Sequence, residues 1–233
     1  MQWSHKLSSR KMVGQVIKRK LPIEDSHLQA PLDNFADPVE HGDHLFLAIC
    51  FTAYHGLMKI GELVIPDDPK RLNIRKTILR HTIKISHKNS IRTYEFELPT
   101  SKSNQRFFGN TILIQARTGS LNPFAIFEGY LAQRDHLFPF FPQLRVRKSG
   151  HLPSRSWFTR RLRTILPTDF SGHSFRAGGA MRLAEVGVPE EKIQAMGRWS
   201  LEAWRIYIRK NPIILVAKAS APKSIFDLRS PYS

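Results

Sequence analysis

The feature that most constrains the fold of this chain is the apolar segment at residues 43–58, DHLFLAICFTAYHGLM. Its apolar residues are too dense for a helix with only one buried face, so we expect a helix inside a protein core. The sequence contains no run of about 18 apolar residues, which argues against a transmembrane helix. Cys50, the single cysteine, lies in this segment and is expected to be a small core residue.

After this segment the pattern changes to an alternation of polar and apolar residues. Residues 82–86 (TIKIS) and 93–98 (TYEFEL) both alternate, and a short polar turn at 87–90 joins them. This pattern predicts a β-hairpin with one solvated face, and residues 111–115 are expected to supply a third strand.

Helix signals dominate the rest of the chain. Pro123 precedes one apolar periodic segment, Gly187 follows another, and Ser200 is a suitable N-cap for a helix that ends at Pro212. The expected helices span 124–134, 156–166, 172–186, 189–196 and the residues between Ser200 and Pro212. The expected fold class is therefore α+β, with mostly helices packed around one small three-stranded antiparallel sheet.

Length and charge narrow the range of functions. The chain has 233 residues, 41% of them hydrophobic, which is enough for one sizeable core. It carries 36 Lys and Arg against 19 Asp and Glu, a formal net charge of +17. Such an excess favours a polyanionic partner, and DNA, RNA and an anionic membrane surface all meet that condition. One cysteine excludes an internal disulfide and is typical of a reducing compartment.

Motifs for several other chemistries are absent from the sequence. There is no GxxxxGK(S/T) phosphate loop, no HExxH and no set of Cys/His pairs suitable for zinc. His41 and His44, in the segment HGDH, are more often capping or surface residues than metal ligands. We therefore expect no cofactor and no metal.

Four segments carry the polar residues that matter together: LMKIGEL at 57–63, PTSKSNQ at 99–105, GHSFRAGGA at 172–180 and GRWSLEAWRIYIR at 197–209. Their order and spacing resemble the catalytic domain of tyrosine recombinases, or phage-integrase-like proteins, and among them the Crypton-type elements of fungi. The resemblance extends over roughly residues 40 to 212. It implies DNA strand cleavage and rejoining through a phosphotyrosine intermediate.

The resemblance also assigns roles to individual residues. Lys102 takes the place of the family's β-hairpin lysine, His173 and Arg176 that of its His-x-x-Arg motif, Trp199 its His/Trp position and Tyr207 its nucleophile. Charge builds on the non-bridging oxygens of a phosphodiester under attack, and cationic donors offset that charge. A spacing of three places the histidine and arginine on one helix face near its N-terminus, where anions are favoured. The tyrosine would attack phosphorus and the lysine would protonate the 5′-hydroxyl leaving group.

Taken singly, each of these residues also has an ordinary structural explanation. A His-x-x-Arg pair is common on helix surfaces, Tyr207 suits the core face of an amphipathic helix, and Lys102 suits a solvated turn. Trp199 is equally explained as a plug at a helix junction, and the glycine pair 178–179 as a site of close packing. The order of all the segments together favours the recombinase interpretation.

The chain departs from the family at the first catalytic arginine, whose place is taken by Lys59. Lysine keeps the positive charge but is a point donor, whereas arginine can donate two bonds to one phosphate. Weak or lost activity with retained DNA binding would follow. The neighbouring Glu62 would support the basic residues without reacting.

The expected domain organisation is also reduced. Residues 1–40 are interpreted as a basic arm or linker in place of the family's core-binding domain, 41–212 as the catalytic domain and 213–233 as a C-terminal tail. Both departures fit a relic of a mobile element or a domesticated DNA-binding protein. The resemblance implies double-stranded DNA as the partner and tetramers that exchange C-terminal segments on paired DNA sites. Charge, the resemblance and the KRK cluster at 18–20 favour a nuclear location, and no membrane partner is expected.

A cluster of basic residues surrounds the expected helix at 156–166, and between residues 136 and 168 no acidic residue accompanies it. Such a cluster would follow the phosphates of a duplex and give salt-sensitive affinity without sequence specificity. Its members are Arg145, Arg147, Lys148, Arg155, Arg160, Arg161 and Arg163.

Three functions therefore stay open. The first is an active or weakened recombinase, and the second is a non-catalytic DNA-binding module with the same fold. Lys59 is the residue that divides these two. The third, a basic RNA-binding protein, uses the charge but leaves Tyr207 and His173 unexplained.

Overall fold

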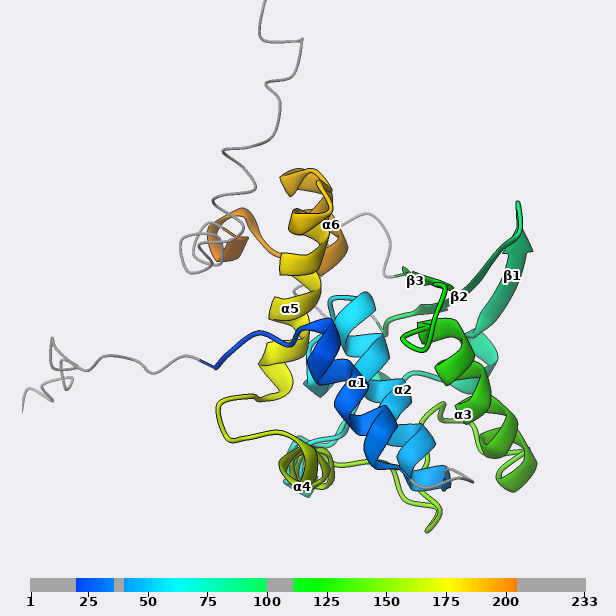
Figure 1. Cartoon of the computed structure of the whole chain (residues 1–233). Helices are drawn as coiled ribbons and strands as arrows, with labels where there is room; N and C mark the ends of the chain where they lie inside the picture. Colours follow the sequence, from blue (N-terminus) through cyan, green and yellow to red (C-terminus); the bar gives the residue numbers. More distant parts are fainter. Residues whose placement is uncertain (1–19, 36–39, 100–110, 205–233) are drawn as a thin grey trace, which may run out of the picture.

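The computed structural model describes residues 20–35, 40–99 and 111–204. Six helices and a three-stranded antiparallel sheet at one side of the molecule make up the described part of the chain, which confirms the α+β class (Figure 1). The helices are α1 (Asp25–Asn34), α2 (His41–His55), α3 (Pro123–Leu137), α4 (Arg155–Ile165), α5 (Gly172–Glu185) and α6 (Glu190–Gly197). The strands are β1 (Lys84–Lys88), β2 (Ile91–Glu97) and β3 (Thr111–Gln115). Short 3-10 turns between α2 and β1 are η1 (Ile60–Glu62), η2 (Pro69–Arg71), η3 (Ile74–Lys76) and η4 (Arg80–Thr82).

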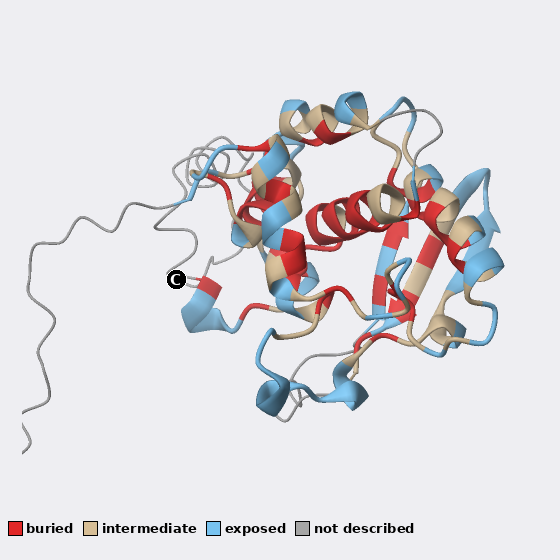
Figure 2. Cartoon of the chain, turned by 90° about the horizontal axis from the view of Figure 1, so that it is seen from below, coloured by how far each residue is buried: buried red, intermediate tan, exposed pale blue. Residues whose placement is uncertain are grey.

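Helix α2 lies at the centre of the molecule, as its apolar sequence predicts (Figure 2). It packs against α1, α3 and α5, and residues 45–54 are all buried. Cys50 is one of them and is confirmed as a core residue. The helix ends at His55 because the chain turns through Gly56 and Leu57, which has a positive φ of 48°.

The sheet has the order β1-β2-β3, with both pairs antiparallel. Asn89 and Ser90 form the hairpin turn, both with positive φ, as two-residue hairpin loops require. On the covered face Tyr94 of β2 lies opposite Ile114 of β3, and both side chains are buried. The predicted hairpin is confirmed by the pairing of β1 with β2, and the expected third strand by the pairing of β2 with β3. The alternation of one buried and one solvated face is found on β2 and β3.

Strand β1 departs from the expected pattern. All of its residues are exposed, and the apolar Ile85 keeps 51% of its surface in contact with solvent. The reason is the sheet order, since β1 is an outer strand while α3 packs on β2 and β3. The alternation at 82–86 thus indicates a strand but does not indicate that one of its faces is covered.

Two adjacent glycines bring α5 into close contact with its neighbours. A Cβ on Gly178 would overlap the backbone of Ile23, and a Cβ on Gly179 would overlap the carbonyl oxygen of Tyr54. Any other residue would therefore push α5 away from α2 or from the segment before α1. The close-packing explanation for this pair is confirmed.

The folded domain begins earlier than the expected boundary at residue 40. The backbone N–H of Ile23 donates to the carbonyl of Ser174 in α5 at 3.0 Å. Ile23 and Leu28 are buried members of the main hydrophobic core. The C-terminal part of the expected arm is thus part of the domain, while residues 1–19 lie outside the described residues.

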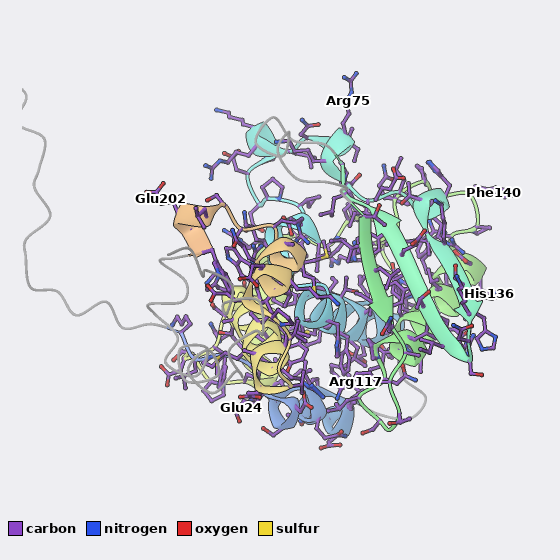
Figure 3. All side chains as sticks on the ribbon, turned by 90° about the horizontal axis from the view of Figure 1, so that it is seen from above. Glu24, Arg75, Arg117, His136, Phe140 and Glu202 are labelled. Carbon is purple, nitrogen blue, oxygen red and sulfur yellow. The ribbon has the colours of Figure 1, made fainter. Side chains whose placement is uncertain are left out.

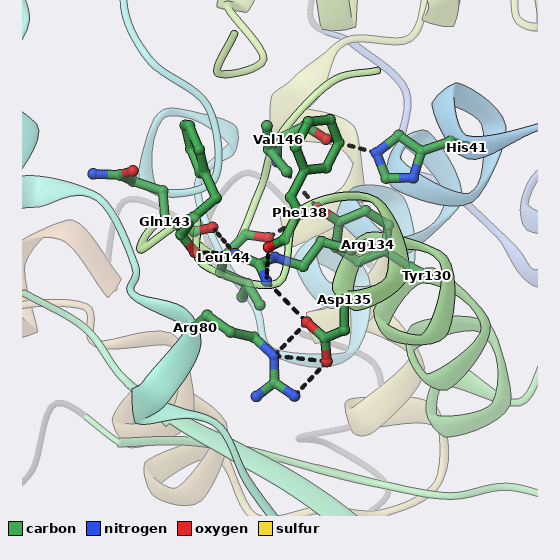
Figure 4. Close-up of polar contacts among 10 residues, drawn as sticks. His41, Arg80, Tyr130, Arg134, Asp135, Phe138, Gln143, Leu144 and Val146 are labelled. Atoms are coloured by element: carbon green, nitrogen blue, oxygen red, sulfur yellow. Dashed lines mark hydrogen bonds and ion pairs between the residues drawn. The ribbon is translucent and has the colours of Figure 1, made fainter. Parts of the chain in front are cut away.

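Buried Arg134, in the last turn of α3, holds the loop that follows that helix (Figure 4). Its guanidinium donates to the carbonyl oxygens of Phe138 and Gln143, each at 2.9 Å, and to that of Phe141. One arginine therefore bonds three carbonyl groups of the helix end and its loop, of which that of Phe138 also accepts from the N–H of Phe141 at 3.2 Å.

The same loop is fixed a second time on its other side. The Tyr130 hydroxyl donates to the carbonyl of Leu144 at 2.9 Å and accepts from the N–H of Val146 at 3.1 Å. His41 Nε2 lies 2.8 Å from the carbonyl oxygen of Val146, and the histidine is buried. The expectation of a surface or capping role for His41 was wrong, because its ring joins the start of α2 to this loop (Figure 4).

Within the described ranges, no three His, Cys, Asp or Glu side chains are grouped so that they would hold a metal ion. No helix in this part of the chain is long and apolar enough to cross a membrane. His44, the other histidine of HGDH, packs against Gly129 of α3.

Candidate active site

A pocket of about 660 Å³ gathers residues from the turn after α2, the start of α4, the start of α5 and the turn after α6. Four of the six expected catalytic side chains line it: Lys59, His173, Arg176 and Trp199. The other two, Lys102 and Tyr207, lie outside the described residues.

The pocket is lined by cations without any carboxylate among its described lining residues. The cationic side chains are those of Lys59, Arg155, Arg176 and Arg198. Arg198 forms an ion pair with Glu62, and the three other positive charges favour an anion within the cavity, because the pocket walls partly shield them from water. The pocket therefore has the electrostatic character of a phosphate site.

The start of α5 adds a helix N-terminus to the pocket. Ser171 is the N-cap, and its side chain accepts from the backbone N–H of His173 at 3.3 Å. The Ser174 hydroxyl in turn accepts from the N–H of Ser171 at 2.9 Å, which completes a capping box. His173 is thus placed in the first helical turn, where the helix dipole is positive.

Arg176 is buried and is held by the turn after α6. Its guanidinium carbon lies 4.3 Å from the centre of the Trp199 ring, and Nη2 donates to the carbonyl of Gly197. Trp199 is itself 7% exposed and packs on Trp204 at 5.0 Å between ring centres. The tryptophan therefore fills a helix junction and also fixes the plane of the arginine in the pocket.

Lys59 is exposed at the mouth of the pocket, and Glu62 fixes its backbone. Glu62 Oε2 accepts from the N–H of Lys59 at 2.9 Å and from Arg198 Nη2 at 3.1 Å. The supporting role expected for Glu62 is visible in these two bonds.

Arg198 was not among the residues expected from the sequence. It has a left-handed backbone with φ of 56°, and its guanidinium donates to the carbonyls of Leu57 at 3.4 Å and Met196 at 3.1 Å. It joins the turn after α6 to the end of α2, which keeps the two walls of the pocket together. Its position in the motif GRW was the available signal.

Nearby charges change the pKa of the His173 imidazole. Partial burial lowers the pKa of its imidazole below the ordinary value of 6.5, and the positive charges of Arg176 and Lys59 lower that pKa further. The imidazole is therefore neutral at pH 7 and has a free nitrogen lone pair for accepting a proton.

The seven basic residues expected to face DNA separate into two groups. Arg155 lines the pocket, Lys148 and Arg160 are exposed, and Arg147 is partly exposed. These four side chains are available to the phosphates of a duplex.

Of the other three, two bond groups of the fold and one is buried. Arg161 forms an ion pair with Asp43 of α2, and Arg163 donates to the carbonyl of Phe170 at 2.8 Å. Arg145 is buried. The local stretch 136–168 lacks acidic residues, but Asp43 supplies one from a distant part of the sequence.

A second exposed basic cluster lies on the turns η2 and η3 and was missed in the sequence. Figure 3 shows that Arg75 projects outward from this segment. The signal was the run PKRLNIRK at 69–76, where asparagine and aspartate caps hold two short turns. The exposed members are Lys70, Arg71, Arg75 and Lys76.

Comparison with known proteins gives structural matches only. No protein-family model matches the chain, and no curated protein matches it. The XerH site-specific recombinase bound to difH substrate in a pre-cleavage complex matches with a TM-score of 0.51 and 15% identity, over 94% of this chain and 58% of that one. Its post-cleavage complex with palindromic difH gives 0.50 and 14%, over 89% of this chain and 54% of that one.

A Tn1549 transposon integrase in complex with transposon right end DNA also matches. The TM-score is 0.50 at 15% identity, over 84% of this chain and 63% of the integrase. This chain thus spans between about half and two thirds of the length of these proteins. The fold of the described residues is that of the tyrosine recombinase catalytic domain.

Proposed function

We propose that this protein binds double-stranded DNA and acts on one phosphodiester of the backbone by the tyrosine recombinase reaction. The observation that carries the proposal is the pocket in which Lys59, His173, Arg176 and Arg198 meet without a carboxylate among the described lining residues. A tetrahedral phosphate that gains negative charge during attack is the substrate that such a pocket stabilises.

In the proposed reaction the Tyr207 oxygen attacks phosphorus while the bond from phosphorus to the 5′ oxygen breaks. The neutral imidazole of His173 accepts the tyrosine proton, and Lys102 gives a proton to the leaving 5′ oxygen. Rejoining is the reverse, with a 5′-hydroxyl attacking the phosphotyrosine. Arg176 offsets charge on the non-bridging oxygens throughout, from a position fixed by Trp199.

Lys59 sets the expected rate. Removing one hydrogen-bond donor from a developing oxyanion costs about 2.7 to 4 kcal/mol, or roughly a hundred- to a thousandfold in rate. A lysine in place of a two-donor arginine is expected to cost about this much. Lys59 therefore also favours a second candidate function, a non-catalytic DNA-binding module that keeps the fold and the cationic pocket.

A covalent-trapping experiment separates the two candidates. The protein is incubated with a randomised pool of nicked duplexes that trap the phosphotyrosyl adduct, and adducts are counted on a denaturing gel. The variants are Lys59→Arg and Tyr207→Phe. An adduct with wild type that Tyr207→Phe abolishes supports cleavage, and an adduct only with Lys59→Arg supports the binding module. No adduct with any variant removes the cleavage proposal.

We propose three further properties on the same basis. The protein is of the Crypton type of mobile element, it works in the nucleus, and it assembles as a tetramer on paired DNA sites without a membrane partner.

The basic cluster of residues 69–76 and the exposed residues of α4 supply DNA contacts that carry affinity. Light scattering of the protein with and without duplex DNA tests the tetramer, since a mass that stays monomeric on DNA excludes it.

A further inference from the structure

Arg145 is a buried cation for which no described residue supplies a compensating negative charge. The residue is 6% exposed, forms no hydrogen bond or ion pair with any residue of the described ranges, and has an enclosed Nη2 atom without an acceptor. Its guanidinium lies 5.9 Å from the centre of the Phe96 ring, at the outer limit of a cation–π contact. Burial lowers its pKa to about 10, so it stays protonated at neutral pH.

The backbone around Arg145 keeps the side chain in this position. The N–H of Leu144 donates to the carbonyl of Ile78 at 2.8 Å, and the Tyr130 hydroxyl bonds the residues on both sides of Arg145. Figure 4 shows Leu144 and Val146 held in this way between α3 and the start of α2. These bonds fix the backbone from which the Arg145 side chain enters the interior.

Arg145 lines a second pocket of about 500 Å³, which shares Gly61 and Arg155 with the candidate active site. Three more cations line it, and all three are exposed: Arg71, Lys76 and Arg155. None of these three forms an ion pair with a carboxylate of the described residues. The pocket thus has one buried and three exposed positive charges.

The carboxylates that line the same pocket already have partners. Glu62 accepts from Arg198 at 3.1 Å, and Asp67 accepts from the N–H of Ser156 at 2.9 Å. Asp68 accepts from the backbone at the start of η2. Asp67 and Asp68 keep their charge, but both are exposed, and Asp67 interacts with the charge of Arg155. None of the three acids forms an ion pair with Arg145, so an anion from outside the described residues would complete the site.

We propose that the second pocket binds a phosphate group, with Arg145 as its buried donor and Arg71, Lys76 and Arg155 at its mouth. A tetrahedral group with several anionic oxygens suits four cations better than a carboxylate, and the guanidinium fork matches two of those oxygens. The phosphate belongs either to DNA that continues from the candidate active site or to a free phosphate compound. Only the DNA source rests on the proposed function.

The test is thermal unfolding of the full chain in increasing inorganic phosphate, against sodium chloride of equal ionic strength. Phosphate also stabilises proteins without binding, so the comparison is between variants. Arg145→Met is matched by Arg147→Met, which removes one charge from a partly exposed neighbour. Loss of charged hydrogen bonds should weaken the apparent phosphate affinity of Arg145→Met by about ten- to a hundredfold, with Arg147→Met close to wild type.

Two further melting measurements test the same proposal. In chloride alone, Arg145→Met should melt at or above the wild-type temperature, because a buried uncompensated charge is removed. Arg145→Lys should keep part of the phosphate response. A phosphate response that is equal in wild type, Arg145→Met and Arg147→Met overturns the proposal.

The source of the phosphate follows from the same titration with saturating duplex DNA present. If DNA abolishes the Arg145-dependent phosphate shift, a backbone phosphodiester occupies the pocket. If the shift persists on top of DNA, the pocket takes a free phosphate compound. Both outcomes support a phosphate site, and neither depends on whether a covalent DNA adduct forms.

Discussion

Replacing Trp199 by alanine is expected to lower the free energy of unfolding by about 4 kcal/mol. The side chain is 7% exposed, so almost all of its surface leaves water on folding. A buried tryptophan removes about 200 Å² from solvent, which corresponds to about 5 kcal/mol at 25 cal/mol per Å². The ring also covers the Arg176 guanidinium at 4.3 Å, a cation–π contact of about 1 kcal/mol. The alanine methyl and partial collapse of the site offset some of this total.

The assay is urea unfolding followed by far-ultraviolet circular dichroism, since fluorescence would change with the tryptophan itself. Trp199→Phe keeps a ring over Arg176 and should lose only about 1 to 2 kcal/mol. Leu201→Ala, at a neighbouring site that is 57% exposed, is the control and should change stability by less than about 0.5 kcal/mol. A loss below about 1 kcal/mol for Trp199→Ala would show that the ring does not hold the junction.

Three other perturbations test separate parts of the fold and the surface. Gly179→Ala should destabilise the protein by at least about 2 kcal/mol in thermal melts, because its Cβ would overlap the Tyr54 carbonyl, whereas Gly61→Ala has open space and should not. Burial and a nearby arginine lower the pKa of His55 from 6.5 to about 3. Between these two pH values the imidazole binds a proton in the unfolded chain but not in the folded one. Stability should therefore drop by about 2 kcal/mol more between pH 7 and 5 in wild type than in His55→Gln, measured by urea unfolding. Arg160→Gln removes an exposed charge of α4 and should reduce the salt dependence of duplex binding by about one unit of slope, without a change in stability.

The elements of this fold could be predicted because each has a strong local signal. The apolar density of α2, the alternation of β2 and the glycine and proline boundaries of the later helices are properties of neighbouring residues. The exposure of Ile85 could not be predicted in this way. Which face of a strand is covered depends on where a distant helix packs, and the alternation of β1 is the same in either case.

Site residues that belong to a local sequence motif could be predicted, whereas residues whose position depends on contacts between distant segments could not. His173 and Arg176 share a helix turn, and Lys59 follows α2 in the expected order. Arg145 looked like a surface cation beside Arg147, but bonds from Tyr130 to the adjacent backbone keep it inside. Its burial depends on contacts between α3 and a loop, which no local pattern in the sequence contains.

In the proposed function the cationic pocket serves cleavage of DNA through a phosphotyrosine. The most direct measurement isolates protein bound covalently to a nicked duplex, digests both DNA and protein, and identifies the nucleotide-bearing peptide by mass spectrometry. We expect a nucleotide on Tyr207, with Lys59→Arg raising its yield and Arg176→Ala removing it. A nucleotide on another residue, or an equal yield from Arg176→Ala, would contradict the assignment of the pocket to this chemistry.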